Sequence, residues 1–454
     1  MVATDIPGNS AKRNFAGGVH PSGRKGLAAD SVIEVLPTPA AVTIPMSQHI
    51  GAPCEPLTKP KQELAIGDLI GESKSFISAP IHASINGTAG MLCSVTLPTG
   101  KRVKAVPVKA SENQPDPTEL YKDFFGGDWP TSGLEQYTPE QITEAVKGAG
   151  ITGMGGATFP TFVKFLKNEK KPIDTLLVNG CECEPYLTSD YRLMIEAPTA
   201  IICGALLAAR ACGARNIIIA IEDNKPLAID IMRRAAKSID INITELPTKY
   251  PQGGEKQTIF SAIGREVPGG KLPLDVGVVV VNVGTVSSVA RAVTRNRPLT
   301  HRVISVTGEG IKHPKNILTP IGASYADLIE HCGGLTADAV RVISGGPMMG
   351  FTVGDLTTPV TKGTSGITVL VKQDVETSQE TTCIRCGKCV DSCPMNLVPT
   401  RIALASRYRE WELADKYHIS SCIECGCCSY VCPASIPLVQ LIKTGKTIKL
   451  KNGS

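Results

Sequence analysis

Two cysteine runs near the end of the chain constrain its fold and chemistry more than any other feature. In each run the cysteines are separated by two, two and three residues, and the last cysteine precedes a proline. This spacing is typical of bacterial ferredoxins that hold two 4Fe–4S clusters. The cysteines concerned are Cys383, Cys386, Cys389 and Cys393 in the first run and Cys422, Cys425, Cys428 and Cys432 in the second.

The spacing also predicts which cysteines share a cluster. Three cysteines at x2 spacing wrap one cluster, whereas the fourth cysteine of the run ligates the other cluster. Zinc is the alternative, since CxxC pairs suit tetrahedral zinc, but zinc chemistry does not require this double spacing. Cys427 is out of phase and is expected not to be a ligand. The predicted ligand sets are Cys383, Cys386, Cys389 and Cys432 for one cluster and Cys422, Cys425, Cys428 and Cys393 for the other.

Composition restricts the number of domains, the class of partner and the cellular compartment of this chain. A chain of 454 residues with 42% hydrophobic and 20% charged residues has room for three or four globular domains. The net charge of +5 gives no case for nucleic acid, and sixteen cysteines of which half lie in cluster motifs favour a reducing compartment. No signal peptide and no apolar run of about eighteen residues is evident. We therefore expect a cytoplasmic chain without a transmembrane segment, docked on a membrane partner.

The N-terminal part is predicted to form short strands after an irregular lead-in over residues 1–45. Turn residues separate strands from Ser47 to about Val108, and the pattern resembles the barrel-sandwich fold of biotinyl and lipoyl carriers. Where those carriers present a modifiable lysine, this chain has Pro80-Ile81-His82-Ala83, so a structural or docking role is expected instead. Residues 1–110 are assigned to this domain and 111–137 to a linker.

The middle of the chain alternates between strands and helices, which predicts a parallel α/β sheet over residues 130–300. Strands are expected at 175–179, 216–221, 242–246 and 277–283, and helices at 138–148, 190–212 and 226–238. Short strands around one helix (Tyr325–His331) indicate a small α+β module over 301–371. A polar link at 372–382 leads into the cluster domain, assigned to 377–445. The lysines near the end are expected in a solvated tail, with contact to an acidic ferredoxin or anionic lipid as the alternative: Lys443, Lys446, Lys449 and Lys451.

Polar and glycine-rich segments follow several of the predicted strands and helices. Because ligands bind outside the carboxyl ends of parallel strands, these segments are candidate cofactor loops. Glycines let backbone N–H groups approach a phosphate, although Gly153-x-Gly155-Gly156 is not the dinucleotide fingerprint and a plain turn is the alternative. Lys164 lies one or two helical turns further on, where it could neutralise a phosphate.

These segments resemble a known family. Gly153–Pro160 with Lys164, Asn179–Pro185, Gly254-Glu255-Lys256 and Asn282–Thr285 resemble the flavin subunit of respiratory complex I. The resemblance is closer to the RnfC family of Rnf electron-transport complexes, and it covers nearly the whole chain in order. It implies a barrel-sandwich domain, a Rossmann-like FMN/NAD(H)-binding α/β core, a β-grasp (SLBB) module and a ferredoxin-type domain. It also implies a noncovalent FMN, NAD(H) as substrate and a peripheral position on the cytoplasmic face of membrane subunits.

The same resemblance implies roles for single residues. Glu182 and Glu184 would face the nicotinamide nucleotide as the catalytic residues, although a solvated acidic loop is the alternative. Met154 and Cys181 depart from the complex I pattern, in which an Arg and an Asp stand at these positions, and Cys181 and Cys183 are expected to pack rather than bind metal. The implied FMN residues are Gly153, Gly155, Gly156, Lys164, Asn179, Asn282 and Thr285, and the implied nucleotide residues are Glu255 and Lys256.

The expected function is electron transfer between NAD(H), FMN and two 4Fe–4S clusters, as part of an ion-translocating ferredoxin:NAD+ oxidoreductase. Hydride carries two electrons and iron–sulfur clusters carry one, so a flavin belongs between them. The partners would be the membrane and ferredoxin-like subunits of such a complex, with ferredoxin indirectly. Two alternatives remain: a soluble flavin and iron–sulfur reductase of the cobalamin reductase type, and a two-cluster relay with a degenerate nucleotide site.

Overall fold

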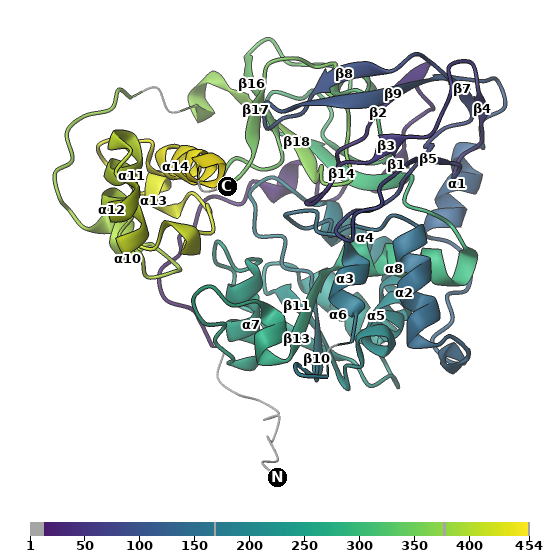
Figure 1. Cartoon of the computed structure of the whole chain (residues 1–454), viewed down its shortest axis with the longest axis horizontal. Helices are drawn as coiled ribbons and strands as arrows, with labels where there is room; N and C mark the ends of the chain where they lie inside the picture. The colour runs from purple at the N-terminus through teal and green to yellow at the C-terminus, as the bar shows by residue number, and fades with distance from the viewer. Residues whose placement is uncertain (1–12, 168, 376–377, 453–454) are drawn as a thin grey trace.

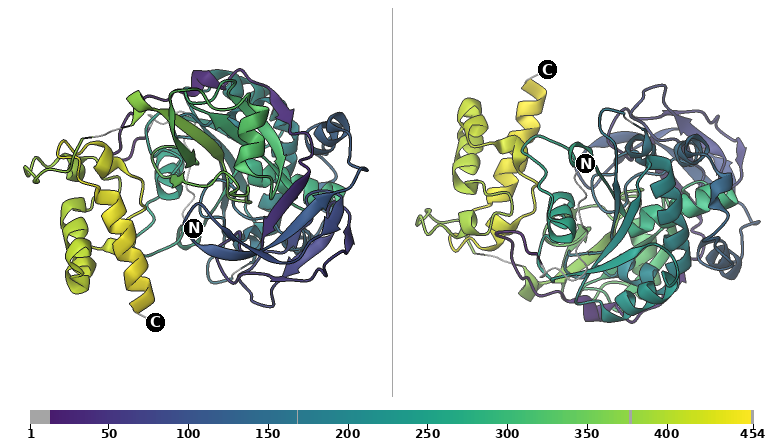
Figure 2. Two further views of the ribbon diagram at one scale, coloured as in Figure 1. Left: turned by 90° about the horizontal axis from the view of Figure 1, so that it is seen from above. Right: turned by 90° about the horizontal axis from the view of Figure 1, so that it is seen from below.

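The computed structural model describes residues 13–167, 169–375 and 378–452 of the chain (Figure 1). The α/β core and the strand-rich parts pack together, and the helical C-terminal part lies beside them in all three views (Figures 1 and 2). The first twelve residues of the expected lead-in lie outside the described residues, as do two residues of the polar link before the cluster domain.

A four-stranded parallel sheet forms the α/β core, as the alternation of strands and helices predicts. The strand order is β12-β11-β10-β13, with β10 and β11 at the centre. Central strands of this kind are apolar on both faces, and β10 is buried at four of its five residues. The strands are β10 (Thr175–Asn179), β11 (Asn216–Glu222), β12 (Asn242–Leu246) and β13 (Val278–Asn282).

Helices cover both faces of this sheet because successive strand residues alternate between two cores. Leu176 and Val178 lie in one core, whereas Leu177 lies in the other with Ile259 of α7. On the first face α5 and α8 cross closely, since a Cβ at Gly204 would lie 1.7 Å from the carbonyl oxygen of Val286. The helices are α2 (Pro139–Gly148), α3 (Thr161–Phe165), α4 (Ser189–Glu196), α5 (Pro198–Cys212), α6 (Pro226–Ala235), α7 (Glu255–Ile263) and α8 (Val283–Arg295).

The structure corrects two expectations in this region. The helix expected over 190–212 is two helices, α4 and α5, bent by 96° at Ala197 because Pro198 begins α5. The linker expected over 111–137 contains helix α1 (Pro117–Phe124) and a buried Trp129. Its polar, turn-rich composition does not reveal the contacts that other elements make with it. One of these is the Arg295 guanidinium, 3.6 Å from the centre of the Trp129 ring.

The barrel-sandwich domain consists of two small sheets with a shared apolar interior. Ile44, Ile70 and Ile81 are buried at 0–1% exposure and connect the two sheets. One sheet contains β2 (Ala41–Pro45), β9 (Arg102–Ala110), β7 (Gly87–Ala89), β4 (Glu63–Leu64) and β8 (Cys93–Thr96). The other contains β3 (Glu55–Pro56), β5 (Leu69–Glu72) and β6 (Ile81–His82).

The module after the α/β core has its own sheet and its own core around the buried Tyr325. Helix α9 spans Tyr325–His331, as predicted. The lead-in is not irregular throughout, since β1 (Ile33–Val35) joins this sheet beside β15. Such a pairing joins residues almost 300 positions apart, and local pattern cannot reveal it. The sheet order is β1, β15 (Lys315–Pro320), β14 (His301–Thr307), β18 (Gly366–Val371), β16 (Ala339–Ser344) and β17 (Phe351–Val353).

The C-terminal part is a small helical domain with the cysteine runs between its helices. Its last helix replaces the expected solvated tail: Lys446 Nζ lies 2.5 Å from Glu424 Oε1, Lys449 pairs with Asp415, and Lys443 lies over the ring of Phe351. The side chain of the fourth lysine in that prediction lies outside the described residues. The helices are α10 (Lys388–Asp391), α11 (Pro399–Tyr408), α12 (Trp411–Lys416), α13 (Cys427–Tyr430) and α14 (Leu438–Asn452).

Among the described residues no single helix is long and apolar enough to cross a membrane. Helices α4 and α5 reach that length and hydropathy only when counted as one, and they are bent by 96°.

Candidate flavin and iron–sulfur sites

The carboxyl ends of the parallel strands bring two predicted asparagines together. Asn179 and Asn282 are register partners at the ends of β10 and β13. Asn179 Nδ2 donates to the carbonyl oxygen of Gly253 at 2.8 Å, which ties the loop after β12 to this edge. Asn282 Oδ1 accepts from the backbone N–H of Gly284 at the start of α8, and its Nδ2 donates to Asp190 Oδ2 at 2.6 Å. Both side chains are therefore held in place before any ligand binds.

The glycine-rich turn lies against this edge. A Cβ at Gly155 would lie 2.9 Å from Asn282 Nδ2, so only glycine lets the turn approach that side chain. At Gly156 a Cβ would meet nothing within 4 Å, and at Gly153 the nearest atom would be 3.7 Å away. The turn is therefore packed on one side and open on the other. Such a cradle lets backbone groups contact a bound phosphate or ring directly.

Met154 and Thr285 join the turn to α8. The backbone N–H of Met154 donates to Thr285 Oγ1 at 3.0 Å, and Thr285 is fully buried. The Met154 side chain is 6% exposed and packs in the core. The residue that departs from the complex I pattern at this position is therefore part of the apolar core.

Lys164 and Glu255 lie together, whereas Lys256 does not join them. Lys164 Nζ donates to the carbonyl oxygen of Val280 at 2.9 Å and lies 3.0 Å from Glu255 Oε1. Lys256 Nζ instead donates to the carbonyl oxygen of Pro268, in the segment after α7. The structure thus brings one residue of the predicted flavin set and one of the predicted nucleotide set into a single ion pair beside β13.

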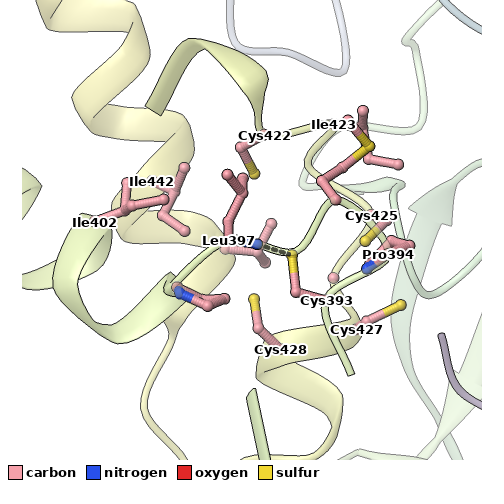
Figure 3. A pocket seen from close by; sticks show the side chains of 14 residues that line it. Cys393, Pro394, Leu397, Ile402, Cys422, Ile423, Cys425, Cys427, Cys428 and Ile442 are labelled. Atoms are coloured by element: carbon pink, nitrogen blue, oxygen red, sulfur yellow. Dashed lines mark hydrogen bonds between the residues drawn. The ribbon is translucent and has the colours of Figure 1, made fainter. Parts of the chain in front are cut away.

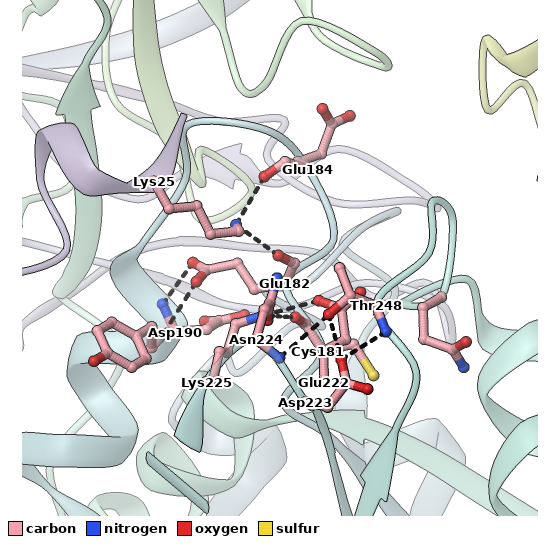
Figure 4. Close-up of polar contacts among 12 residues, drawn as sticks. Lys25, Cys181, Glu182, Glu184, Asp190, Glu222, Asp223, Asn224, Lys225 and Thr248 are labelled. Atoms are coloured by element: carbon pink, nitrogen blue, oxygen red, sulfur yellow. Dashed lines mark hydrogen bonds and ion pairs between the residues drawn. The ribbon is translucent and has the colours of Figure 1, made fainter. Parts of the chain in front are cut away.

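Glu182, in the loop after β10, points toward the start of α4. Its carboxylate accepts from the backbone N–H groups of Asp190 (2.8 Å) and Tyr191 (3.2 Å) and from the hydroxyl of Ser189 (3.2 Å). A carboxylate at this place satisfies unpaired N–H groups and favours the helix dipole. The side chain therefore fixes the loop to α4 (Figure 4).

Glu184 points the other way, toward the β-grasp module. Its carboxylate accepts from the backbone N–H groups of Met348 (3.1 Å) and Met349 (2.8 Å). Burial raises the pKa of Glu184 to about 7, although the two N–H donors oppose this shift. The two predicted catalytic carboxylates thus diverge, and each connects the loop to a different neighbour.

Sequence reasoning missed the charged groups that surround this loop. Lys225 Nζ lies 2.8 Å from Glu222 Oε2, both side chains are 1% exposed, and the ammonium also donates to the carbonyl oxygen of Cys181. Burial and the charge of Glu182 raise the pKa of Asp190 to about 7. Their place in the sequence could have revealed them, since Glu222 is the last residue of β11 and Lys225 follows it, and ligands bind at the carboxyl ends of parallel strands.

Cysteines of both runs line one apolar cavity in the C-terminal domain. Figure 3 shows Cys393, Cys422 and Cys428 pointing toward one another, with Cys427 turned away. Burial raises the pKa of Cys428 to about 12, and the nearby thiols of Cys425, Cys422 and Cys393 add to the shift. The structure therefore brings Cys393 of the first run to the three x2-spaced cysteines of the second run.

The other four cysteines lie nearer the surface. Cys383 and Cys386 are exposed, whereas Cys389 is buried and Cys432 is intermediate. Burial raises the pKa of Cys389, and the thiols of Cys432 and Cys383 add to the shift because they are close. Cys432 thus lies beside cysteines of the first run, which is the grouping that crossed ligation requires.

Tyr250 connects the flavin edge to the buried cysteines. It lies in the loop after β12, three residues before Gly253, and its hydroxyl donates to the carbonyl oxygen of Cys425 at 2.8 Å. Tyr250, Cys425 and Cys427 share one small apolar cluster, against which Cys183 and Met348 also pack. The strand-end loops and the buried cysteine cavity are therefore in direct contact.

The residues present fit the expected cofactors. The four predicted ligand cysteines of the buried group line its cavity, and Cys389 lies near Cys383 and Cys432 in the other group; thiols are the donors that an iron–sulfur cluster requires. At the flavin edge, the open side of the Gly155–Gly156 turn provides the cradle that a phosphate-bearing ring compound needs. Asn282 lies against this turn, its register partner Asn179 ends the neighbouring strand, and Lys164 is held beside β13 by the Val280 carbonyl.

Family models match most of the chain in the expected order. The model of the RnfC barrel sandwich hybrid domain matches residues 13–113, and that of the Nuo51 FMN-binding domain matches residues 146–291. An SLBB domain matches residues 303–352, and a 4Fe-4S dicluster domain matches residues 382–436. These matches confirm the predicted fold class.

Similar proteins extend the comparison to the whole chain. The C subunit of the proton-translocating ferredoxin:NAD(+) oxidoreductase complex of Clostridium ljungdahlii is 42% identical over 95% of this chain and 93% of its own length. The C subunit of the Na(+)-translocating complex of Acetobacterium woodii is 41% identical over 95% of this chain and 96% of its own length. The C subunit of the ion-translocating oxidoreductase complex of Rhodobacter capsulatus is 40% identical over 95% and 82%. The chain therefore belongs to the RnfC family of ion-translocating ferredoxin:NAD(+) oxidoreductase complexes.

Proposed function

We propose that this chain is the NADH-linked subunit of an ion-translocating ferredoxin:NAD+ oxidoreductase. It carries electrons between NAD(H), a noncovalent FMN and two 4Fe–4S clusters. The observation that supports this most directly is the contact through Tyr250, which places the strand-end loops against the cavity lined by Cys393, Cys422, Cys425 and Cys428. A two-electron site and a one-electron site are thereby neighbours within one chain.

The proposed FMN site is the open side of the glycine-rich turn. Asn179 and Asn282 fix its floor, and the N-terminus of α8 lies beside it with Thr285 tied to the turn. Lys164 supplies the positive charge that a phosphate requires, in exchange for its contact with Glu255. When bound, FMN accepts two electrons from NADH and releases them singly.

The proposed NAD(H) site lies over the loop after β10. The carboxylates of Glu182 and Glu184 are already occupied by backbone N–H groups, so we assign them the task of holding this loop in shape. Glu255 would become free to bind a ribose hydroxyl once Lys164 turns to the FMN phosphate. Lys256 follows it on α7, at the edge of the same site.

The two cysteine groups differ in burial, and this gives the proposed order of transfer. The buried group with Cys425 lies next to the flavin edge, and the group with Cys383 and Cys386 lies at the surface. The buried cluster would therefore exchange electrons with FMN, and the exposed cluster with another subunit. In the proposed assembly the chain is a peripheral subunit on the cytoplasmic face of the membrane, beside membrane and ferredoxin-like subunits.

Anaerobic purification and NADH titration test this function. We expect eight iron atoms and about one FMN per chain, with flavin bleaching on addition of NADH. Stoichiometric zinc without iron would overturn the cluster assignment. Iron–sulfur absorption without flavin would support the two-cluster relay instead, and a fully active chain that never co-purifies with membrane subunits would support the soluble reductase.

A pair of lysine variants tests the site. Lys164→Ala should weaken FMN binding about ten- to a hundredfold, as expected for loss of one charge-assisted contact of about 1.5–3 kcal/mol, and should keep both clusters. Lys256→Ala is the matched control, since its ammonium contacts the Pro268 carbonyl away from the turn. Equal FMN retention in the two variants would place the phosphate elsewhere.

A further inference from the structure

The segment from residue 13 to residue 36 crosses several parts of the molecule before the two barrel-sandwich sheets begin at β2. Gly18 N donates to the carbonyl oxygen of Ser392 at 2.9 Å, and Val19 bridges to Tyr250. Further on, the carbonyl oxygen of Gly23 accepts from the N–H of Tyr186 at 2.7 Å. We call residues 13–36 the N-terminal strap. It contacts the cluster domain at one end and the loop after β10 further along.

Lys25 of this strap makes an unusual set of contacts. Its Nζ donates to the backbone carbonyl oxygens of Glu182 (2.8 Å), Glu184 (3.0 Å) and Leu187 (2.7 Å). One ammonium therefore uses all three of its protons within a single loop, as Figure 4 shows for the first two carbonyls. Lys25 lies outside the α/β core in sequence, yet its charged group lies inside the loop of that core.

The loop has a backbone shape that needs such support. Glu182 (φ 46°) and Tyr186 (φ 71°) are both in the left-handed region, which is unfavourable for non-glycine residues. Lys225 holds the same loop from the opposite side through the carbonyl oxygen of Cys181. Two lysines from distant parts of the chain thus fix carbonyl groups at four positions of one strained loop. Charge-assisted hydrogen bonds of this type offset such strain.

We propose that Lys25 is a positioning residue for the reaction with NAD(H). It fixes the backbone conformation of loop 182–187, against which the nucleotide docks. This rests on the proposed function, because it takes that loop as the nucleotide side of the site. Lys25 touches neither substrate nor cofactor. It acts through the loop carbonyls, so its loss changes the loop rather than the cofactor content.

The test compares Lys25→Met with Arg24→Met. Both remove one positive charge from the same strap, but Arg24 pairs with Glu309 at 3.3 Å and with Asp374 at 3.8 Å, and neither carboxylate belongs to loop 182–187. We expect Lys25→Met to keep FMN and iron and to be reduced normally by dithionite. Its kcat/KM for NADH with ferricyanide as acceptor should fall about ten- to a hundredfold, the loss typical of a misplaced binding element, and Arg24→Met should match the wild type.

Amide hydrogen exchange separates this proposal from the proposed function. Exchange at residues 182–187 should be faster in Lys25→Met than in Arg24→Met, whether or not NADH reduces the wild-type protein. Lys25→Gln, which keeps hydrogen-bond donors, should lie between wild type and Lys25→Met, and it replaces Lys25→Met if that variant does not fold. Wild-type exchange together with wild-type kcat/KM in the Lys25 variants would overturn the proposal. Parallel loss of FMN, iron and thermal stability would also overturn it, since that is the result of a merely structural role.

Discussion

The two cysteine runs have the same spacing and different surroundings. Cys425 and Cys428 of the second run are 8% exposed, and Cys425 packs against Tyr250 of the flavin domain, whereas Cys383 and Cys386 of the first run are exposed. Spacing sets which irons a loop can reach, but it does not set what covers the cluster. Burial depends on other parts of the chain, and these leave Cys383 and Cys386 of one cluster site exposed.

Glycines of the N-terminal strap and of the second run show how this cover is achieved. A Cβ at Gly17 (φ 69°) would lie 2.7 Å from the carbonyl carbon and oxygen of Cys393. At Gly426 (φ 82°) a Cβ would lie 2.7 Å from the carbonyl oxygen of Met348. Both glycines permit a backbone contact that a larger residue would block. The strap and the β-grasp module thus both contact the buried cluster site, which supports the electron-transfer order proposed above.

The largest expected effect comes from breaking the crossed ligation. Cys393→Ser should remove the buried cluster formed with Cys422, Cys425 and Cys428, although Cys393 belongs to the first run. NADH should then no longer reduce the exposed cluster, because the step from the flavin is missing. Cys432→Ser should remove the exposed cluster and leave the buried cluster reducible by NADH. EPR spectra of both variants show which cluster each one loses. Crossed ligation would be refuted if each variant lost the cluster held by the other three cysteines of its own run.

The rate of iron loss to a chelator should be the next largest difference between the two clusters. The exposed cluster should lose its iron several-fold faster under a membrane-impermeant chelator and mild oxidant, because Cys383 and Cys386 are open to solvent. The measurement is the time course of iron release together with the EPR signal of each cluster. A single rate for all eight irons would show that burial does not distinguish the two sites.

Local pattern predicts much of this molecule, and the reasons are visible in particular elements. The capping box at Thr138 and Gln141 marks the start of α2, and the apolar run at Thr175–Asn179 marks β10. Each of these signals lies within a few residues of the element that it predicts. The two cysteine groupings also follow from spacing, because one loop motif determines both.

Contacts between distant segments were not predictable in this way. Lys25 acts on a loop about 160 residues away, and β1 pairs with β15 almost 300 residues away. Glu182 and Glu184 appear in the sequence as one acidic loop, but their side chains diverge because Glu182 caps α4 and Glu184 reaches the β-grasp module. Which partner each side chain contacts depends on the elements that the fold brings beside it, and local sequence does not reveal these elements.

Tyr250→Phe should have a moderate effect, confined to the buried cluster. It removes the hydroxyl that donates to the carbonyl oxygen of Cys425 and leaves that buried acceptor without its partner, at a cost of about 1–3 kcal/mol. We expect a lower free energy of unfolding and an altered EPR signal from the buried cluster, with the exposed cluster unchanged. Equal changes in both signals would show that the tyrosine acts on the domain as a whole.

The pH dependence of stability should show a smaller effect at Glu184, which links the loop after β10 to Met348 and Met349 on the side of the buried cluster. Burial raises its pKa from about 4.5 to about 7, so the folded state binds the proton more tightly than the unfolded state. This contribution to stability is fully present below pH 4.5 and is lost as the pH rises through 7. Glu184→Gln should flatten that part of the profile of unfolding free energy against pH, and an unchanged profile would contradict the shift.

Cys427→Ser should have the smallest effect, although Cys427 is fully buried between two ligand cysteines. Cys427 lines the cavity, but in Figure 3 its sulfur is turned away from those of Cys393, Cys422 and Cys428, and its Sγ donates weakly, at 4.0 Å, to the carbonyl oxygen of Tyr250. A serine hydroxyl can serve the same acceptor in similar volume, so the stability change should stay below about 1 kcal/mol. Iron content should remain eight per chain, and both EPR signals should persist. Loss of the buried cluster would mean that Cys427 replaces a neighbouring cysteine as ligand, and the comparison between the two runs would then rest on the wrong set of thiols.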